Sequence, residues 1–279
     1  MGFVLQDQIN KKAVKMPGAP LVMGILNVTP DSFSDGGEFV EQSVIEQRAL
    51  QMIEQGADII DVGGESTRPG ADKVSQEIEL QRVLPVVEWI SQRFDIPVSV
   101  DTYKPEVMRQ AIIAGAQIVN DVNGLQEQGA IDVVKQSDVA VCLMHKKGSP
   151  KNMQDKPKYF DVVAEVSEFL LERAKVCEQA GINRHKIILD PGFGFGKELE
   201  HNVELFNEMS TLVELGYPLL VGVSRKRMIG QILDDAPLDK RLCGSVSAAV
   251  LAGLKGAKIV RVHDVEPTVD ALKIVSHLL

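Results

Sequence analysis

Three polar side chains, Asp101, Asn120 and Asp190, each stand at or near the end of an apolar run of the sequence. A carboxylate in such surroundings is costly unless it is paired or solvated. It can accept two parallel N–H bonds from a planar amidine-like group, and an asparagine amide adds both a donor and an acceptor. Capping of the following helices is the alternative role for each residue taken alone. For the three together we favour a binding site for a planar heterocycle with mixed polar edges.

Basic side chains follow other apolar runs, namely Arg68, Lys226, Arg261 and His263. Arg261 and His263 alternate with valines, so a strand would place both on one face, which turns inward in a barrel. The phosphate sites of many barrels lie after the last two strands. An isolated histidine more often has a structural role, and the segment Ser-Arg-Lys at 224–226 could be a surface turn. Together these groups favour an anion site, with Lys226 also able to donate to a carbonyl and a ring nitrogen.

Several other kinds of site lack their usual motifs. The five histidines form neither H-x-H nor H-E-x-x-H, so a zinc hydrolase is disfavoured. No G-x-S-x-G elbow is present, which removes the usual sign of a hydrolase triad. The glycine-rich stretch 192–196 is not a dinucleotide fingerprint, and residues 224–226 lack the spacing of a P-loop.

The composition is that of an ordinary globular protein, with 279 residues, 44% hydrophobic and 25% charged. The net charge of −9 disfavours nucleic-acid binding, because phosphate tracking needs a basic surface. No apolar run is long enough for a membrane span, and residues 1–20 contain no apolar core of a secretory leader. Three cysteines without metal-ligand spacing fit a reducing compartment. We therefore expect a cytoplasmic protein with neither a membrane nor a nucleic-acid partner.

Eight strand–helix units must position these side chains. We predict strands at 21–27, 58–64, 97–102, 117–123, 139–145, 186–191, 218–225 and 258–263. We predict helices at 41–55, 76–94, 105–114, 128–136, 162–179, 200–215, 226–254 and 267–279. An uninterrupted series of this kind favours an α/β fold of the (β/α)8 TIM-barrel type, with a doubly wound sheet as the alternative. We expect a single domain over residues 1–279, with 1–20 as an N-terminal extension.

Five segments of the chain resemble the signatures of the dihydropteroate synthase family. They are MGILNVTPDSFSDGG at 23–37, DVGGESTRPG at 61–70, DPGFGFG at 190–196, SRK at 224–226 and RVHD at 261–264. The resemblance implies an enzyme that joins (7,8-dihydropterin-6-yl)methyl diphosphate to 4-aminobenzoate, giving 7,8-dihydropteroate and diphosphate. A pteridine carries a 2-amino-4-oxo edge, which is a donor pair of the kind that Asp101 and Asp190 could bind.

The resemblance also implies roles for individual residues. Asp101, Asn120, Asp190 and Lys226 would hold the pterin, with Met144 and Gly222 packed beside it and Ser224 in the same site. Asn27 would ligate Mg2+ on the diphosphate, whose oxygens would bind Arg68, Arg261 and His263. Phe33, Thr67, Pro69 and Phe195 would shape the aminobenzoate pocket, with Asp35 near the metal. Mg2+ and the cationic side chains would neutralise the leaving group. The nucleophile would be a weakly basic aryl amine, which needs no strong general base.

One position departs from the family pattern. Many relatives have serine after the lysine of the Ser-Arg-Lys segment, whereas this chain has Arg227, so the group that meets the aminobenzoate carboxylate is left open. The family also implies a homodimer. Two alternative functions are a methyltetrahydrofolate-binding methyltransferase domain and a non-catalytic pterin-binding protein. Neither explains the presence of Asn27, Arg261 and His263 as well as a diphosphate substrate does.

Overall fold

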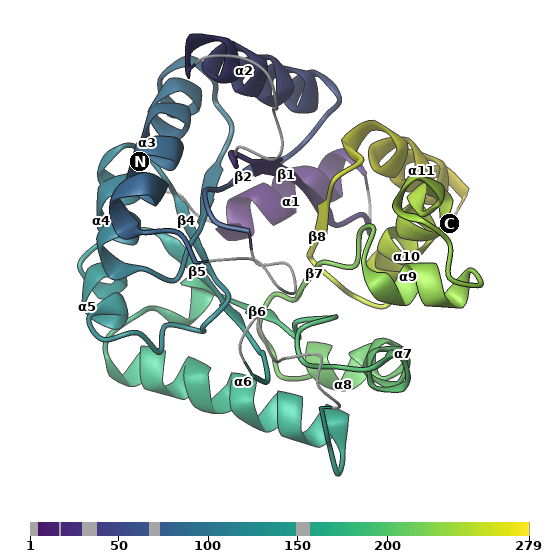
Figure 1. Cartoon of the computed structure of the whole chain (residues 1–279). Helices are drawn as coiled ribbons and strands as arrows, with labels where there is room; N and C mark the ends of the chain where they lie inside the picture. The colour runs from purple at the N-terminus through teal and green to yellow at the C-terminus, as the bar shows by residue number, and fades with distance from the viewer. Residues whose placement is uncertain (1–4, 17, 30–37, 67–72, 149–156, 279) are drawn as a thin grey trace.

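Eight parallel strands form a barrel with the helices around it (Figure 1). This computed structural model describes residues 5–16, 18–29, 38–66, 73–148 and 157–278. The strands are β1 (Leu21–Asn27), β2 (Ile59–Gly63), β3 (Val98–Asp101), β4 (Ile118–Asp121), β5 (Ala140–Met144), β6 (Ile187–Asp190), β7 (Leu220–Val221) and β8 (Ile259–Val262). Seven neighbouring pairs are parallel ladders. The eighth contact, between β6 and the approach to β7, is one bridge from Leu189 to Leu219. The predicted TIM barrel is therefore confirmed.

The helices follow the predicted order, with two corrections. They are α2 (Glu38–Glu54), α3 (Gln76–Arg93), α4 (Pro105–Ile113), α5 (Ala130–Lys135), α6 (Val162–Gln179), α7 (Leu199–Asn207), α8 (Met209–Val213), α9 (Arg227–Ile232), α10 (Leu242–Leu254) and α11 (Val265–Leu278). The helix predicted at 200–215 is two helices, α7 and α8. The helix predicted at 226–254 is also broken, since Asp234 and Asp235 have positive φ and Pro237 precedes a short 3-10 turn. No helix of the described ranges is long and apolar enough to cross a membrane.

The seventh strand is much shorter than the predicted 218–225. Only Leu220 and Val221 of this segment pair with β8. The chain then leaves the sheet, and Arg225 lies in the left-handed region with φ of 56°. That conformation is incompatible with an extended strand. The early end of β7 turns residues 222–226 into a loop over the barrel mouth.

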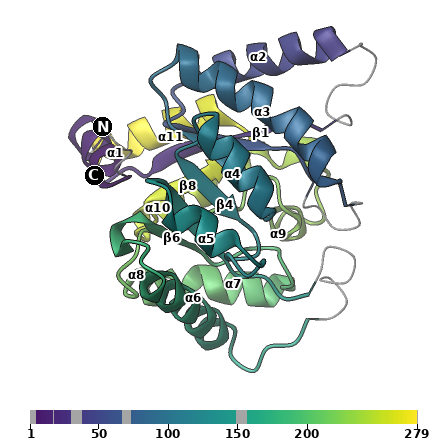
Figure 2. The same ribbon diagram turned by 90° about the vertical axis from the view of Figure 1, so that its left-hand side faces the viewer.

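The N-terminal extension contains a helix that the sequence analysis missed, α1 (Leu5–Lys15). It covers the end of the barrel where the strands begin (Figure 2). Leu5 is buried together with inward-facing residues of the strands, such as Met23 and Ile59, and Ile9 packs against the same cluster. Lys12 Nζ adds an ion pair with Asp58 at 2.7 Å. The end of the barrel at which the strands begin is consequently a closed apolar core.

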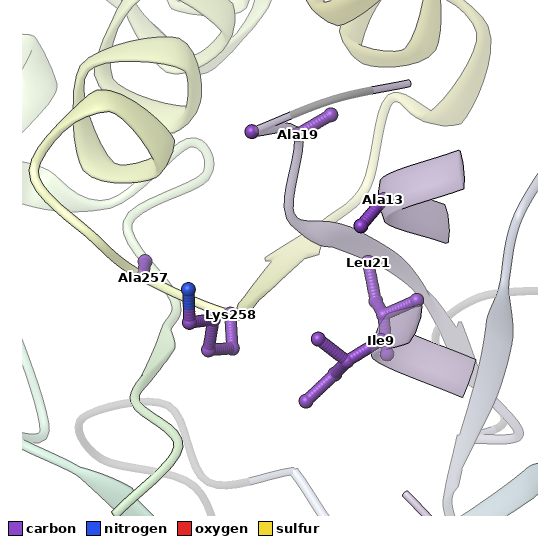
Figure 3. A pocket seen from close by; sticks show the side chains of 7 residues that line it. Ile9, Ala13, Ala19, Leu21, Ala257 and Lys258 are labelled. Atoms are coloured by element: carbon purple, nitrogen blue, oxygen red, sulfur yellow. The ribbon is translucent and has the colours of Figure 1, made fainter. Parts of the chain in front are cut away.

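A small pocket lies between α1 and the strand starts (Figure 3). It has a volume of about 100 Å³, and Ile9, Leu21 and Lys258 are among the residues that line it. Leu21 begins β1 and Lys258 directly precedes β8. The pocket is therefore at the opposite end of the barrel from Asp101 and Asp190, which end their strands.

We predict that Leu5→Ala destabilises the whole barrel, because Leu5 is 2% exposed and closes the lower core. A buried Leu→Ala change costs about 2–5 kcal/mol, which urea-induced unfolding would measure. Leu50→Ala is the matched control, since Leu50 is an exposed residue of α2. Equal stability of the two variants would show that α1 does not close the barrel.

Candidate active site

The polar residues predicted from the sequence meet at the carboxyl ends of the strands. Asp101 ends β3 and pairs in register with Asn120 of β4, while Asp190 ends β6 and pairs with Met144 of β5. All four side chains are buried, although three of them are polar. The barrel therefore brings the predicted heterocycle-binding residues together, at the carboxyl ends of adjacent strands.

Arg261 is the cation that connects this group. Its Nε donates to Asp61 Oδ2 at 2.6 Å, and its Nη2 donates to Asp101 Oδ2 at 2.7 Å. Asn120 Nδ2 also donates to Asp61 Oδ2, at 3.2 Å. The other oxygen of Asp61, Oδ1, is buried and has no hydrogen-bond partner among the described residues.

Asp61 was not predicted as a site residue, although its surroundings in the sequence contain a signal. Asp61 is 0% exposed and stands in the middle of an apolar strand. A carboxylate at such a position must be paired with a cation or neutralised. Its partner, Arg261, is 200 residues away in the sequence, so the pairing became visible only with the closed barrel.

Burial disfavours the charged forms of Asp101, Asp190 and Lys226, while their oppositely charged neighbours favour those forms. Burial raises the pKa of Asp101 to about 7, against the effect of Arg261. It also raises the pKa of Asp190, with Lys226 opposing, and lowers the pKa of Lys226 to about 8, with Asp190 opposing. The protonation of one group thus depends on its neighbours, so a ligand that donates to the carboxylates favours their ionised forms.

Lys226 lies against the glycine-rich loop that follows β6. Its Nζ donates to the carbonyl oxygen of Phe193 at 2.5 Å and lies 4.5 Å from the ring centroid of Phe195. Phe195 and Lys226 were assigned to two different substrates by the resemblance. Their contact means that the two predicted subsites adjoin.

The end of β8 is joined to the loop after β7. The Oγ of Ser224 lies 3.1 Å from both the backbone nitrogen and Nδ1 of His263. Arg225 binds Asp264 with two parallel bonds, of 2.9 and 2.5 Å. Gly222 lies next to Arg261, since a Cβ on it would be 3.7 Å from Arg261 Cβ. These contacts place Ser224, Gly222 and His263 at the mouth, and diphosphate binding by Arg261 and His263 stays a prediction.

A second cluster, which was not predicted from the sequence, lies beside the carboxyl end of β2. Lys104 forms ion pairs with Glu65 and with the buried Glu79. Tyr103 Oη and the backbone nitrogen of Val74 also donate to Glu65. The cluster therefore joins the segment that ends β2 to the start of α3 through Glu65 and Val74. The predicted site residues Phe33, Asp35, Thr67, Arg68 and Pro69 lie outside the described residues.

The surroundings of Asn27 fit a magnesium ion carried on a diphosphate. Asn27 ends β1 in register with Gly63, and a Cβ on Gly63 would lie 3.7 Å from both Asn27 Oδ1 and Asp101 Oδ2. Because residue 63 is a glycine, it places no side chain between these two oxygens. The described part of the chain contains no cluster of three histidine, cysteine or acidic ligands for a metal. Mg2+ suits such a place, because it usually takes few protein ligands and several from phosphate and water.

Comparison with known proteins agrees with this geometry. The model of the family described as "Pterin binding enzyme" matches residues 23–263. The dihydropteroate synthase of Escherichia coli K12 is 55% identical over 262 residues, which are 93% of this chain and 92% of that protein. A structure of the Xanthomonas albilineans dihydropteroate synthase with 4-aminobenzoic acid has a TM-score of 0.88 and 50% identity, covering 93% of each chain. The same enzyme in complex with 7,8-dihydropteroate has a TM-score of 0.85 and 46% identity, covering 93% of this chain and 94% of that one.

The chain therefore belongs to the pterin-binding enzymes. Its similarity extends over nearly the whole of both chains, and the relatives share one activity. Within the family it is a member of the dihydropteroate synthases, which are transferases.

We predict that Gly192→Ala disrupts the site, because a Cβ there would lie 1.9 Å from the backbone oxygen of His145. Gly129→Ala is a matched control, since both glycines have positive φ but Gly129 has open space around its Cβ position. The control should lose only the stability that its new backbone strain costs, about 1–2 kcal/mol. Gly192→Ala should lose more stability than the control, measured by urea unfolding. Equal losses in both variants would contradict the close packing of the loop on His145.

Proposed function

We propose that the mouth of this barrel joins (7,8-dihydropterin-6-yl)methyl diphosphate to 4-aminobenzoate and releases diphosphate. The observation that carries the proposal is the convergence of Asp101, Asn120, Asp190 and Lys226 at the strand ends of a dihydropteroate synthase. Two buried carboxylates and an amide are complementary to the amino and ring N–H groups of a pterin. Lys226 supplies donors for the carbonyl and ring nitrogen on the other edge.

The proposed reaction needs charge neutralisation more than a base. The bond from the methylene carbon to the diphosphate oxygen breaks, and the bond to the aryl nitrogen forms, with loss of one proton from that nitrogen. Mg2+ at Asn27, together with Arg68, Arg261 and His263, would neutralise the departing diphosphate. The electron-rich pterin can share the positive charge that develops at the methylene, so a dissociative path is favoured.

The proposed aminobenzoate site lies beside Lys226. Phe195 packs on Lys226 and offers one wall of this site. Phe33, Thr67 and Pro69 complete it by resemblance, and both of their loops are rich in glycine, serine and aspartate. We propose that the diphosphate substrate binds first, because its charge gives Arg68 and the metal a partner before the second pocket forms.

The direct test is release of diphosphate by the purified protein with the pterin diphosphate, with and without 4-aminobenzoate. Release that depends on 4-aminobenzoate, with formation of 7,8-dihydropteroate, is the expected result. Pterin binding without any release would instead support a non-catalytic binding protein. Methyl transfer from methyltetrahydrofolate would support the methyltransferase alternative.

We also propose that the protein works as a cytoplasmic homodimer. Large apolar side chains are exposed on two adjacent helices, Leu251 and Leu254 on α10 and Ile274 and Leu278 on α11. Such a patch is suited to contact with a second copy of the chain. Cys142 and Cys177 are buried free thiols, which suits a reducing compartment.

We predict that Asp190→Asn weakens pterin binding by tens-fold or more. The amide places a donor opposite the donors of the pterin, and each unmatched buried group costs about 1–3 kcal/mol. Calorimetry with a pterin would measure the loss. Asp270→Asn, at an exposed position of α11, is the control and should bind as the parent does. Unchanged affinity in folded Asp190→Asn would remove Asp190 from the site.

We predict that turnover requires Mg2+ or a similar hard cation, since the amide oxygen of Asn27 and the diphosphate are oxygen ligands. Excess chelator should abolish diphosphate release, and added Mg2+ should restore it. Calorimetric binding of a pterin that lacks the diphosphate should be unaffected by the chelator. Full turnover in chelator would reject the assignment of the metal.

A further inference from the structure

Lys197 is a buried lysine that the proposed reaction does not use. It is 2% exposed and follows the glycine-rich loop after β6. Its Nζ lies 2.9 Å from Nδ1 of His145, 2.9 Å from the carbonyl oxygen of Gly192 and 3.3 Å from that of Phe195. A lysine ammonium group has three N–H donors, so three acceptors around one nitrogen match its full capacity.

The three acceptors of Lys197 belong to two different segments. His145 follows β5, whereas Gly192 and Phe195 stand near the two ends of the loop after β6. The ammonium group therefore bridges the loop across its base and ties it to the neighbouring strand. Asn202 of α7 reinforces this arrangement, since its Oδ1 accepts from Gly194 N at 2.7 Å and its Nδ2 donates to Lys197 O at 3.1 Å.

The same loop carries both groups that Lys226 contacts in the proposed site. Phe193 supplies the carbonyl oxygen that accepts from Lys226, and Phe195 supplies the ring beneath its ammonium group. The carbonyl of Phe195 is itself an acceptor of Lys197. The backbone of Phe195 is thus held by Lys197, while its ring faces Lys226.

We propose that Lys197 is a positioning residue of the synthase reaction, which sets the wall of the 4-aminobenzoate pocket by holding the loop 192–196 against His145. The inference rests on the proposed function, because it assumes that Phe195 faces the aminobenzoate. Lys197 acts through Phe195, whose backbone carbonyl it binds, and does not itself touch a substrate. The pterin-binding carboxylates lie on the strands, so they depend less on this loop.

The alternative role for Lys197 is a purely structural one, as a satisfied buried cation that stabilises the fold. Burial lowers the pKa of Lys197 to about 7, with Asp190 opposing this effect. It also lowers the pKa of His145 to about 3, so the imidazole is neutral and its Nδ1 can accept from Lys197. If the role is structural, replacing Lys197 would lower the stability and the amount of active enzyme and leave both KM values unchanged. If Lys197 positions the loop, its replacement would raise the KM for 4-aminobenzoate and not the KM for the pterin substrate.

The test compares Lys197→Met with the parent protein for both substrates. Methionine keeps the length and removes the donors, so His145 Nδ1 and the carbonyl oxygens of Gly192 and Phe195 each lose the bond from Lys197. The expected result is a KM for 4-aminobenzoate raised about tenfold or more, with pterin affinity by calorimetry within about threefold of the parent. Lys175→Met, at an exposed position of α6, is the control. A proportional loss of kcat with both KM values unchanged would overturn the proposal.

Lys197→Arg keeps the charge and provides a second test if the methionine variant does not fold. Its planar fork cannot match three acceptors that converge on one nitrogen. The positioning role therefore predicts a raised KM for 4-aminobenzoate in this variant also, and a KM equal to that of the parent would contradict it. Failure of the proposed function is separate, because it would appear as absence of turnover in the parent protein.

Discussion

The site depends on one guanidinium group, that of Arg261, which two buried carboxylates share. Asp61 and Asp101 each accept one bond from it, and Asp61 is wholly buried. Removing one partner from a buried ion pair costs about 3–5 kcal/mol, because the remaining charge is uncompensated. Asp61, Asp101 and Arg261 therefore depend on one another, since each buried charge is stable only while its partners are present. A substrate that brings donors and a diphosphate enters a site whose charges are already held in place.

The closed barrel is what brings this set together. In the sheet order, β1 and β2 lie between β8, which carries Arg261, and β3, which carries Asp101. A flat sheet would separate β8 from β3 by three spacings of about 4.8 Å each, whereas curvature points their side chains at one axis. Below this layer, α1 and the apolar strand starts exclude water. The polar groups are consequently confined to the strand ends, where a substrate can reach them.

Much of this arrangement could be predicted from the sequence, and the failures have physical reasons. The strand at 21–27 and the helix at 162–179 were predicted with their observed limits, since each is a clear apolar pattern with a turn at both ends. α1 was missed because a helix with few apolar residues is stabilised by the barrel end that it covers. The partner of Asp61 could not be predicted, because an ion pair across a barrel leaves no local pattern, and the contact of Lys197 with His145 likewise joins residues that lie far apart in the sequence.

The most direct test of this account is a double-mutant cycle of Asp61→Asn and Arg261→Met, with the free energy of unfolding measured in urea. Arg261→Met alone should cost about 3–5 kcal/mol, since it leaves Asp61 and Asp101 buried without a cation. Adding Asp61→Asn should relieve part of that loss, so the double variant should be more stable than the sum of the single losses predicts. We expect a coupling of at least about 1 kcal/mol. Losses that add within about 0.5 kcal/mol would contradict the claim that one shared guanidinium holds the site together.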